Sequence, residues 1–341
     1  MAKINLLTIH WGKSFGAVMQ TYATCKLLEQ AGHVVNVINL IHPKVKQYYK
    51  DFKHWAYFWE EFQFWLFKKK YFSKMTSKGY CIKDIKLPEA DYTIVGSDQV
   101  WNYDITSCFG YTFFLDFVPD SQKRIAFCSS FGKKETNYPP EYKDKTKDCL
   151  SRFTALSVRE NTGCDILKNE YNLDAVNLLD PTLLWGDFAK IIKSKKEEKT
   201  IFRFLLNNDE EALKRSQFIS KEVGCPIHTP TVFERLFVSG PVNWINHINN
   251  SKYIITDSFH GVAMSIIFHK QFYVFCADQK KFTRLESLLQ LLNLESRYVK
   301  SSEDFVRRKE ELLMSINYDV VDMILTEERK KCLRFINDFI R

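Results

Sequence analysis

Residues 4–40 contain a complete strand–helix–strand pattern, which constrains the fold more than any other stretch of the chain. Apolar residues predict a strand at 4–9, a helix at 17–30 and a second strand at 34–40. Gly32 follows the helix at a position where glycine commonly ends one. Two strands joined by a helix over so short a distance favour a parallel sheet with a right-handed crossover.

The same alternation of strands and helices continues along the chain and predicts two α/β domains in series. Further buried strands are predicted at 91–96, 124–129, 155–158, 176–179, 201–206, 253–255 and 272–275. We expect an N-terminal α/β domain at 1–184, interrupted by a helical insertion at 43–86. A C-terminal α/β domain is expected at 185–303 and terminal helices at 304–341. A cleft between two such domains is the expected ligand site.

The composition is that of a globular protein of a reducing compartment. Of the 341 residues, 45% are apolar and 26% charged, and no apolar run reaches the roughly 18 residues that span a membrane. The start of the chain leads directly into a strand, so no signal peptide is expected. Nine scattered cysteines without a CxxC pair predict reduced thiols and no structural zinc. We therefore expect a cytoplasmic protein.

The positive charge of the chain is concentrated in one segment. Residues 44–86 hold eleven lysines and four acidic residues, which gives +7 of the total formal charge of +8, together with fourteen aromatic residues. This composition predicts aromatic, basic helices. One interpretation is that they contact the inner face of the cell membrane, and the other is that the aromatic side chains pack on the first domain while the lysines are solvated. Nucleic-acid binding is not expected, because the rest of the chain shows no binding module.

Polar loops follow several predicted strands, and the loop after residues 253–255 is the most informative. Ser258 is suited to cap the following helix, and His260 lies at the start of that helix. In open α/β sheets, ligands bind at the carboxyl ends of strands, where helix N-termini receive anions. The alternative is structural: Asp257 and Ser258 cap the helix, and His260 fills a polar corner.

Five segments of the chain together resemble the polysaccharide pyruvyltransferase family. In order, the matching segments are Gly-Ala-Val-Met-Gln-Thr-Tyr-Ala at 16–23, Gly-Ser-Asp-Gln-Val-Trp-Asn at 96–102, Ser-Val-Arg-Glu at 157–160, Asp-Pro-Thr-Leu-Leu at 180–184 and Thr-Asp-Ser-Phe-His-Gly at 256–261. Each segment alone is a weak signal, but five in the right order form a specific one. The match covers roughly residues 5–295.

This resemblance implies an α/β fold of two Rossmann-like domains with a central cleft, similar to the GT-B glycosyltransferases. It also implies transfer of the enolpyruvyl group of phosphoenolpyruvate to two hydroxyls of a sugar, which forms a cyclic pyruvate ketal and releases phosphate. The expected acceptor is a cell-surface polysaccharide, such as an exopolysaccharide or capsule, or its polyprenyl-diphosphate-linked precursor. Phosphoenolpyruvate is a substrate, and neither a cofactor nor a metal is expected.

The donor site predicted from the resemblance lacks one cation of the family pattern. Some branches of the family have Arg-Leu-His where this chain has Ser258, Phe259 and His260. The histidine is kept and the arginine is not, so other cations are expected to bind the donor anion. A guanidinium binds a carboxylate or phosphate through two parallel hydrogen bonds. The donor-binding residues we predict are Arg159, Ser258, Phe259, Lys281, Arg284, Ser129 and Ser130.

Proton transfer and acceptor binding are assigned to other loops. His260 is the predicted proton-transfer residue, because an imidazole can exchange a proton near neutral pH. Asp98 is the predicted base at the acceptor hydroxyl. The predicted acceptor-binding residues are Gly16, Gln20, Gln99 and Asn102. The structural alternatives are a surface pair of Arg159 with Glu160 and a hydrogen-bonded structural loop at 96–102.

Two other functions remain open from the sequence. A GT-B glycosyltransferase that uses a sugar nucleotide would have the same architecture. A carbohydrate-binding protein without turnover would have the same polar loops. Release of phosphate from phosphoenolpyruvate in the presence of a sugar acceptor distinguishes the three.

Overall fold

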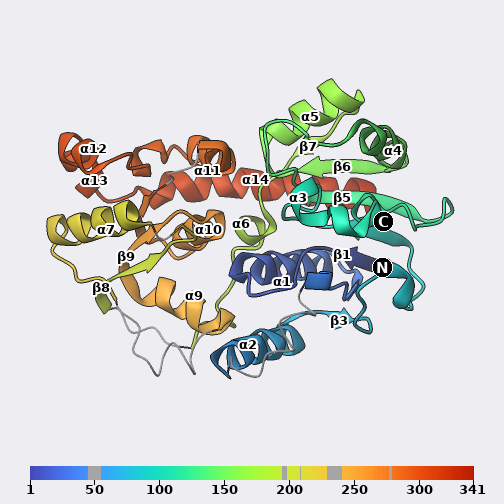
Figure 1. Ribbon diagram of the computed structural model, residues 1–341, viewed down its shortest axis with the longest axis horizontal. Coiled ribbons are helices and arrows are strands. Elements are labelled where there is room, and N and C mark those ends of the chain that lie inside the picture. Colours follow the sequence, from blue (N-terminus) through green and yellow to red (C-terminus); the bar gives the residue numbers. More distant parts are fainter. Residues whose placement is uncertain (45–54, 194–197, 208, 229–239, 276–278) are drawn as a thin grey trace. The chain divides into compact units, whose positions relative to one another are not determined.

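The computed structural model describes residues 1–44, 55–193, 198–207, 209–228, 240–275 and 279–341, without the side chains of 55–57 and 279–283. The chain divides into two compact units (Figure 1). The N-terminal unit consists of Met1–Trp55, Trp65–Trp185 and Glu327–Arg341, and the C-terminal unit of Ala56–Phe64 and Gly186–Thr326. The chain thus passes to the second unit twice, at Ala56 within the predicted insertion and again at Gly186.

The N-terminal unit is built on a parallel sheet of seven strands in the order β3-β2-β1-β4-β5-β6-β7 (Figure 1). The strands are β1 (Lys3–Leu7), β2 (Val34–Val37), β3 (Lys74–Met75), β4 (Tyr92–Val95), β5 (Lys123–Ser129), β6 (Ala155–Val158) and β7 (Val176–Asn177). All four residues of β4 and the last four of β1 are buried, as expected of strands covered on both faces. The predicted parallel sheet is confirmed.

Helices connect these strands. They are α1 (Phe15–Gln30), α3 (Tyr103–Thr106), α4 (Pro140–Ser151), α5 (Asn161–Tyr171) and α6 (Pro181–Trp185). A side chain caps the N-terminus of α1 and of α3. The Ser14 side chain accepts a hydrogen bond from the backbone N–H of Ala17 and caps α1. After α1, Gly32 has a positive φ of 89°, which agrees with its predicted role in ending the helix.

The insertion at 43–86 differs from the predicted set of helices. It contains one long helix, α2 (Trp55–Tyr71), the short strand β3 and a turn of 3-10 helix, η2 (Ile82–Asp84). Strand β3 pairs with β2 and extends the sheet by one edge strand. Two residues are too few to show a strand pattern, so this pairing has no local signal in the sequence. Residues 45–54 of the insertion lie outside the described part of the chain.

The C-terminal unit contains a second parallel sheet, with strand order β10-β9-β8. Its strands are β8 (Glu198–Phe204), β9 (Ser251–Thr256) and β10 (Gln271–Val274), and single bridges at Ile227 and Tyr298 extend its two edges. The helices of this unit are α7 (Glu210–Glu222), α9 (Pro241–Asn250), α10 (Phe259–Ile267), α11 (Gln279–Leu291), α12 (Ser302–Arg307) and α13 (Lys309–Leu313).

The terminal helices do not form a separate group. Residues up to Thr326 belong to the C-terminal unit, and the rest of α14 (Tyr318–Phe339) belongs to the N-terminal unit. There, Phe335 contacts Phe127 of β5 with ring centroids 6.2 Å apart. Arg329 donates to the backbone carbonyls of Leu183 and Leu184 in α6. These contacts are long-range, so helix periodicity alone could not assign them.

The strand order of the N-terminal unit is that of a Rossmann fold, with the reversal of direction between β1 and β4. In such sheets the loops that leave the carboxyl ends of the two central strands diverge, and ligands bind between them. Here these are the loop from β1 to α1 and the loop at 96–102 after β4. Among the helices of the described residues, none combines the length and the apolar character needed to cross a membrane.

Candidate functional site

The loop between β1 and α1 is held by buried side chains. Gln20 is completely buried, and its Nε2 donates to the backbone carbonyl of Ile9 at 2.9 Å and to Thr8 Oγ1 at 3.0 Å. Thr8 Oγ1 in turn donates to the carbonyl of Ser97 at 2.7 Å. Gly16 is buried in the first turn of α1. Gln20 thus joins the two loops at the reversal point of the sheet, and its predicted contact with an acceptor stays a prediction.

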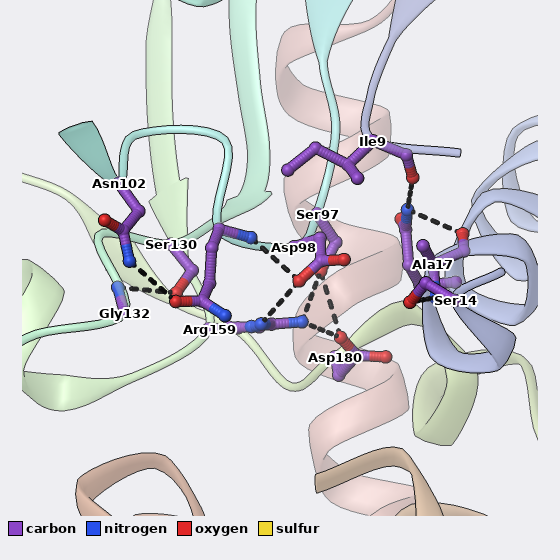
Figure 2. Close-up of polar contacts among 12 residues, drawn as sticks. Ile9, Ser14, Ala17, Ser97, Asp98, Asn102, Ser130, Gly132, Arg159 and Asp180 are labelled. Atoms are coloured by element: carbon purple, nitrogen blue, oxygen red, sulfur yellow. Dashed lines mark hydrogen bonds and ion pairs between the residues drawn. The ribbon is translucent and has the colours of Figure 1, made fainter. Parts of the chain in front are cut away.

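Arg159 lies at the end of β6 among three carboxylates, and Figure 2 shows its contacts with two of them, Asp98 and Asp180. Its Nη1 donates to Asp180 Oδ2 at 2.7 Å, and its Nη2 donates to Asp98 Oδ1 at 3.2 Å. Glu160 Oε2 lies 3.7 Å from Arg159 Nε. The side chains of Arg159, Asp180 and Glu160 are buried, so the alternative of a surface pair between Arg159 and Glu160 is wrong.

The positive charge of Arg159 is compensated inside the protein by the neighbouring carboxylates. Burial by itself disfavours the charged guanidinium, but the carboxylates of Asp180, Asp98 and Glu160 outweigh it and raise the pKa of Arg159 above its ordinary value. The guanidinium therefore already has anionic partners where it lies. Binding of the donor anion by Arg159 was predicted from the sequence and stays a prediction.

Asp98 is the member of this cluster that reaches the surface. Its side chain is 14% exposed, and its Oδ1 also accepts a hydrogen bond from the backbone N–H of Gln99 at 2.9 Å. Its φ of 78° lies in the left-handed region, which aspartate adopts more readily than most residues. Ser97, the residue before Asp98, is also held in place, because its Oγ donates a hydrogen bond to Asp180 Oδ2 at 3.0 Å. The loop is thus held in one conformation, with the Asp98 carboxylate at the carboxyl end of β4.

The other polar residues that we predicted in this unit, Gln99, Asn102, Ser129 and Ser130, make hydrogen bonds within the protein. Asn102 Nδ2 donates to Gln99 Oε1 at 2.8 Å, and Asn102 Oδ1 caps α3. Ser130 Oγ donates to Glu160 Oε1 at 2.6 Å, and Ser129 Oγ donates to the carbonyl of Gly96 at 3.2 Å. These contacts agree with a hydrogen-bonded loop at 96–102, which does not preclude acceptor binding.

Gly132 allows the loop after β5 to approach the loop after β4. Its φ is 69°, and a Cβ atom at this position would overlap the side chain of Gln99. Its backbone N–H donates to Ser130 Oγ at 3.0 Å (Figure 2). A glycine is therefore required here for two independent reasons.

The C-terminal unit contains the turn between β9 and α10. Ser258 Oγ accepts a hydrogen bond from the backbone N–H of Gly261 at 3.3 Å, which confirms its capping role. Thr256 Oγ1 accepts from the N–H of Ser258 at 3.1 Å. Asp257 does not cap α10; its two carboxylate oxygens accept hydrogen bonds from the backbone N–H groups of Leu206 and Asn207, at 2.6 and 2.8 Å. Asp257 and Ser258 thus hold different segments: Asp257 binds the backbone at 206–207, and Ser258 caps α10.

His260 lies in the first turn of α10 and is 8% exposed. Its ring meets the ring of Phe259 edge-on, with centroids 5.3 Å apart. Arg284 is half-buried in α11, and the side chain of Lys281 lies outside the described residues. The predicted residues thus form two groups. One group, of Asp98, Gln99, Asn102, Ser129, Ser130 and Arg159, lies at the carboxyl edge of the first sheet, and the other, of Ser258, Phe259 and His260, lies in the turn after β9.

Sequence reasoning missed the role of Asp180 and Glu160 at this site. Asp180 is part of a recognised motif, but no local pattern shows that it meets a side chain 21 residues away. The available signal was that two charged residues, Arg159 and Glu160, directly follow a buried strand. Among the described residues, no group of three or more histidine, cysteine, aspartate or glutamate side chains could hold a metal ion.

The family of the chain follows from a match to a family model. The model for polysaccharide pyruvyl transferase matches residues 15–275, which is most of the chain. The chain belongs to the polysaccharide pyruvyl transferase family. The resemblance predicted from five short motifs is thereby confirmed. Membership of this family implies a transferase of polysaccharide biosynthesis, with a sugar or polysaccharide as acceptor. No curated protein matches the chain by sequence.

Several solved structures share the fold of this pyruvyl transferase family member. A UDP-N-acetylglucosamine 2-epimerase has a TM-score of 0.53 at 11% identity, covering 98% of this chain and 95% of its own. The protein LpCGTa, solved in complex with UDP, has a TM-score of 0.51 at 9% identity, covering 99% of both chains. The chain therefore has the predicted GT-B-like α/β fold, while the predicted cleft stays a prediction.

Proposed function

We propose that this protein transfers the enolpyruvyl group of phosphoenolpyruvate to a sugar and forms a cyclic pyruvate ketal. The observation that carries the proposal is the family match over residues 15–275, within which the histidine motif at 256–261 begins a helix at the end of a buried strand. The donor is negatively charged, and the helix N-terminus offers a favourable electrostatic position for an anion.

The reaction requires two proton movements. Carbon C3 of the enol gains a proton, and C2 forms bonds to two sugar oxygens while the bond from C2 to the phosphate oxygen breaks. Of the two hydroxyl protons that the sugar loses, one is balanced by the proton gained at C3 and the other leaves with phosphate. We assign the proton transfer at the donor to His260, because imidazole serves this role near neutral pH.

We propose that the acceptor hydroxyl binds at the carboxyl edge of the sheet in the N-terminal unit. Asp98 presents a carboxylate at the carboxyl end of β4, at the reversal point where open α/β sheets bind ligands. A carboxylate fixed by a guanidinium can accept a hydroxyl hydrogen bond without changing its own position. Gln99 and Asn102 are the neighbouring groups proposed to contact other sugar hydroxyls. The donor charge is assigned to Arg284 and Lys281, and the predicted binding of the donor by Arg159 is tested by the variant Arg159→Lys described below.

The acceptor is proposed to be a sugar of a cell-surface polysaccharide or of its polyprenyl-diphosphate-linked precursor. The test is incubation of the purified protein with phosphoenolpyruvate and a panel of sugar acceptors. The expected result is stoichiometric phosphate release and a product whose mass exceeds the acceptor by one pyruvate less one water. Consumption of a sugar nucleotide with glycosyl transfer, and no phosphate release, would instead establish a glycosyltransferase. Binding of the acceptors without either reaction would establish a carbohydrate-binding protein.

A further inference from the structure

Helix α2 carries apolar side chains on two opposite faces, and only one of them is buried. Phe64 and Phe67 are almost completely buried. The ring of Phe67 contacts the ring of Tyr22 on α1, with centroids 6.4 Å apart. The ring of Tyr71 also contacts the Tyr22 ring, with centroids 6.1 Å apart. This buried face explains how α2 packs. It therefore confirms part of the packing interpretation of the aromatic segment.

The opposite face of α2 is exposed. Phe58 is 68% exposed and Trp65 49% exposed, while Phe62 and Leu66 are 37% and 38% exposed. Positions 58, 62, 65 and 69 recur at helical spacing, so these side chains form one stripe along the helix. A helix that is apolar on both sides is unusual at the surface of a soluble unit, and exposed apolar stripes of this kind mark interaction surfaces.

Lysines lie at the C-terminal end of this apolar stripe. Lys68, Lys69 and Lys70 form the last turn of α2, and Lys69 Nζ lies 5.0 Å from the centre of the Trp65 ring, in a cation–π contact. Lys74 in β3 is also exposed. The acidic residues of the helix, Glu60 and Glu61, are half-buried. The apolar stripe thus ends in a group of exposed positive charges.

We propose that the exposed stripe of Phe58, Phe62, Trp65 and Leu66, with Lys69, Lys70 and Lys74, binds the surface of an anionic lipid bilayer. Aromatic side chains suit the headgroup region, and lysines beside them are attracted by anionic lipids. Because Lys69, Lys70 and Lys74 are exposed and positively charged, two copies of this face would repel each other, whereas an anionic surface complements it. The helix would lie in the interface plane with its stripe inserted.

This inference is independent of the proposed reaction, since it rests only on α2 and its neighbouring lysines. It would have a consequence for that reaction, because a protein held at the membrane surface meets lipid-linked sugars there. A soluble oligosaccharide acceptor would not require such a surface. Membrane binding and turnover can therefore be tested separately.

The test is co-sedimentation of the full chain with vesicles of phosphatidylcholine alone or of phosphatidylcholine with phosphatidylglycerol. Three variants are compared with wild type. The first, Lys69→Glu/Lys70→Glu/Lys74→Glu, reverses the charge of the face. The second, Phe58→Ser/Trp65→Ser, removes the two most exposed apolar side chains. The matched control, Lys134→Glu/Lys145→Glu/Lys147→Glu, makes the same charge change at three exposed lysines near or on α4. Circular dichroism establishes that each variant is folded.

The expected result is binding to the phosphatidylglycerol vesicles that weakens with salt, and little binding to phosphatidylcholine alone. The charge-reversed and serine variants should each lose at least tenfold in affinity, while the control variant binds like wild type. Equal loss in the control would show attraction by net charge and overturn the proposal. Absence of lipid-dependent binding would also overturn it. So would a wild-type dimer in sedimentation velocity that dissociates in the serine variant, because the stripe would then bind a second copy.

Discussion

Nη1 of Arg159 donates to Oδ2 of Asp180 at 2.7 Å, and neither side chain is exposed to solvent. Asp180 also accepts hydrogen bonds from the backbone N–H and the hydroxyl of Thr182, at 3.0 and 2.7 Å. The pair therefore joins the end of β6 to the start of α6. Through Asp98, the same guanidinium fixes the loop after β4. One buried cation thus positions three segments of the N-terminal unit.

Arg159→Lys tests whether this cation is an anchor or a ligand of the donor. Lysine keeps the charge but lacks the planar fork of the guanidinium, so it cannot reproduce both the Nη1 contact with Asp180 and the Nη2 contact with Asp98 in their present geometry. We expect the free energy of unfolding to fall by about 1–3 kcal/mol, the usual contribution of a hydrogen bond to a charged group. Urea denaturation measures this change. An increase in the KM for phosphoenolpyruvate with unchanged stability would show instead that Arg159 binds the donor.

His260→Ala tests the proposed proton transfer. Removal of a general acid or base lowers turnover by about 100-fold or more, so kcat should fall by at least that factor while the protein stays folded. The matched control is His269→Ala, which removes an exposed imidazole that contacts Asp322 at 3.2 Å within the C-terminal unit. Turnover close to wild type in folded His260→Ala would show that His260 has a structural role.

Gly261→Ala tests how tightly the histidine turn is packed. A Cβ atom at this position would overlap the Thr256 hydroxyl and lie 3.1 Å from Thr256 Cβ. Overpacking of this kind costs about 1–3 kcal/mol. In the double variant Thr256→Ala/Gly261→Ala, the hydroxyl is absent. The double variant should therefore lose less free energy of unfolding than the two single variants lose in sum. Strict additivity in thermal or urea denaturation would contradict the close contact.

His10 makes the stability of the N-terminal unit dependent on pH. Burial, with a smaller contribution from Lys68, lowers the pKa of His10 to about 4 from 6.5. As the pH falls from 6.5 to 4, the unfolded state binds the proton first, so the free energy of unfolding should decrease over this window, by up to about 3 kcal/mol. In His10→Gln this contribution is absent. Urea denaturation of both proteins at several pH values should give curves that diverge above about pH 4, and parallel curves would refute the assignment.

Removal of divalent metal ions should leave the reaction unchanged. We propose that arginine, lysine and a helix N-terminus bind the negative charges of the donor. In the part of the chain that the structure describes, no group of three or more histidine, cysteine, aspartate or glutamate side chains could hold a metal ion. We therefore expect equal initial rates before and after treatment with EDTA followed by dialysis. A loss of rate that one added metal restores would show that a metal ion takes part.

Local sequence patterns determined the elements of this protein and the identity of its family. Strand and helix patterns are local, so buried runs such as 91–96 and the capping residue Ser258 could be recognised without the fold. The motifs could be recognised for the same reason, because each is a short continuous segment. The concentration of lysines and aromatic residues at 44–86 is also a property of the sequence alone.

Only the tertiary structure decided which partners these side chains have. Asp98 and Asp180 are 61 and 21 residues from Arg159, and their contact depends on the order of strands in the sheet. The amide of Gln20 has the donor and acceptor groups that a ligand could use, yet the packing of α1 buries it against the loop from β1 to α1. Likewise, the sequence of α2 is aromatic around most of its circumference, and packing against Tyr22 determined which face is buried and which is exposed. Burial and pairing result from contacts between distant segments, which short-range periodicity does not encode.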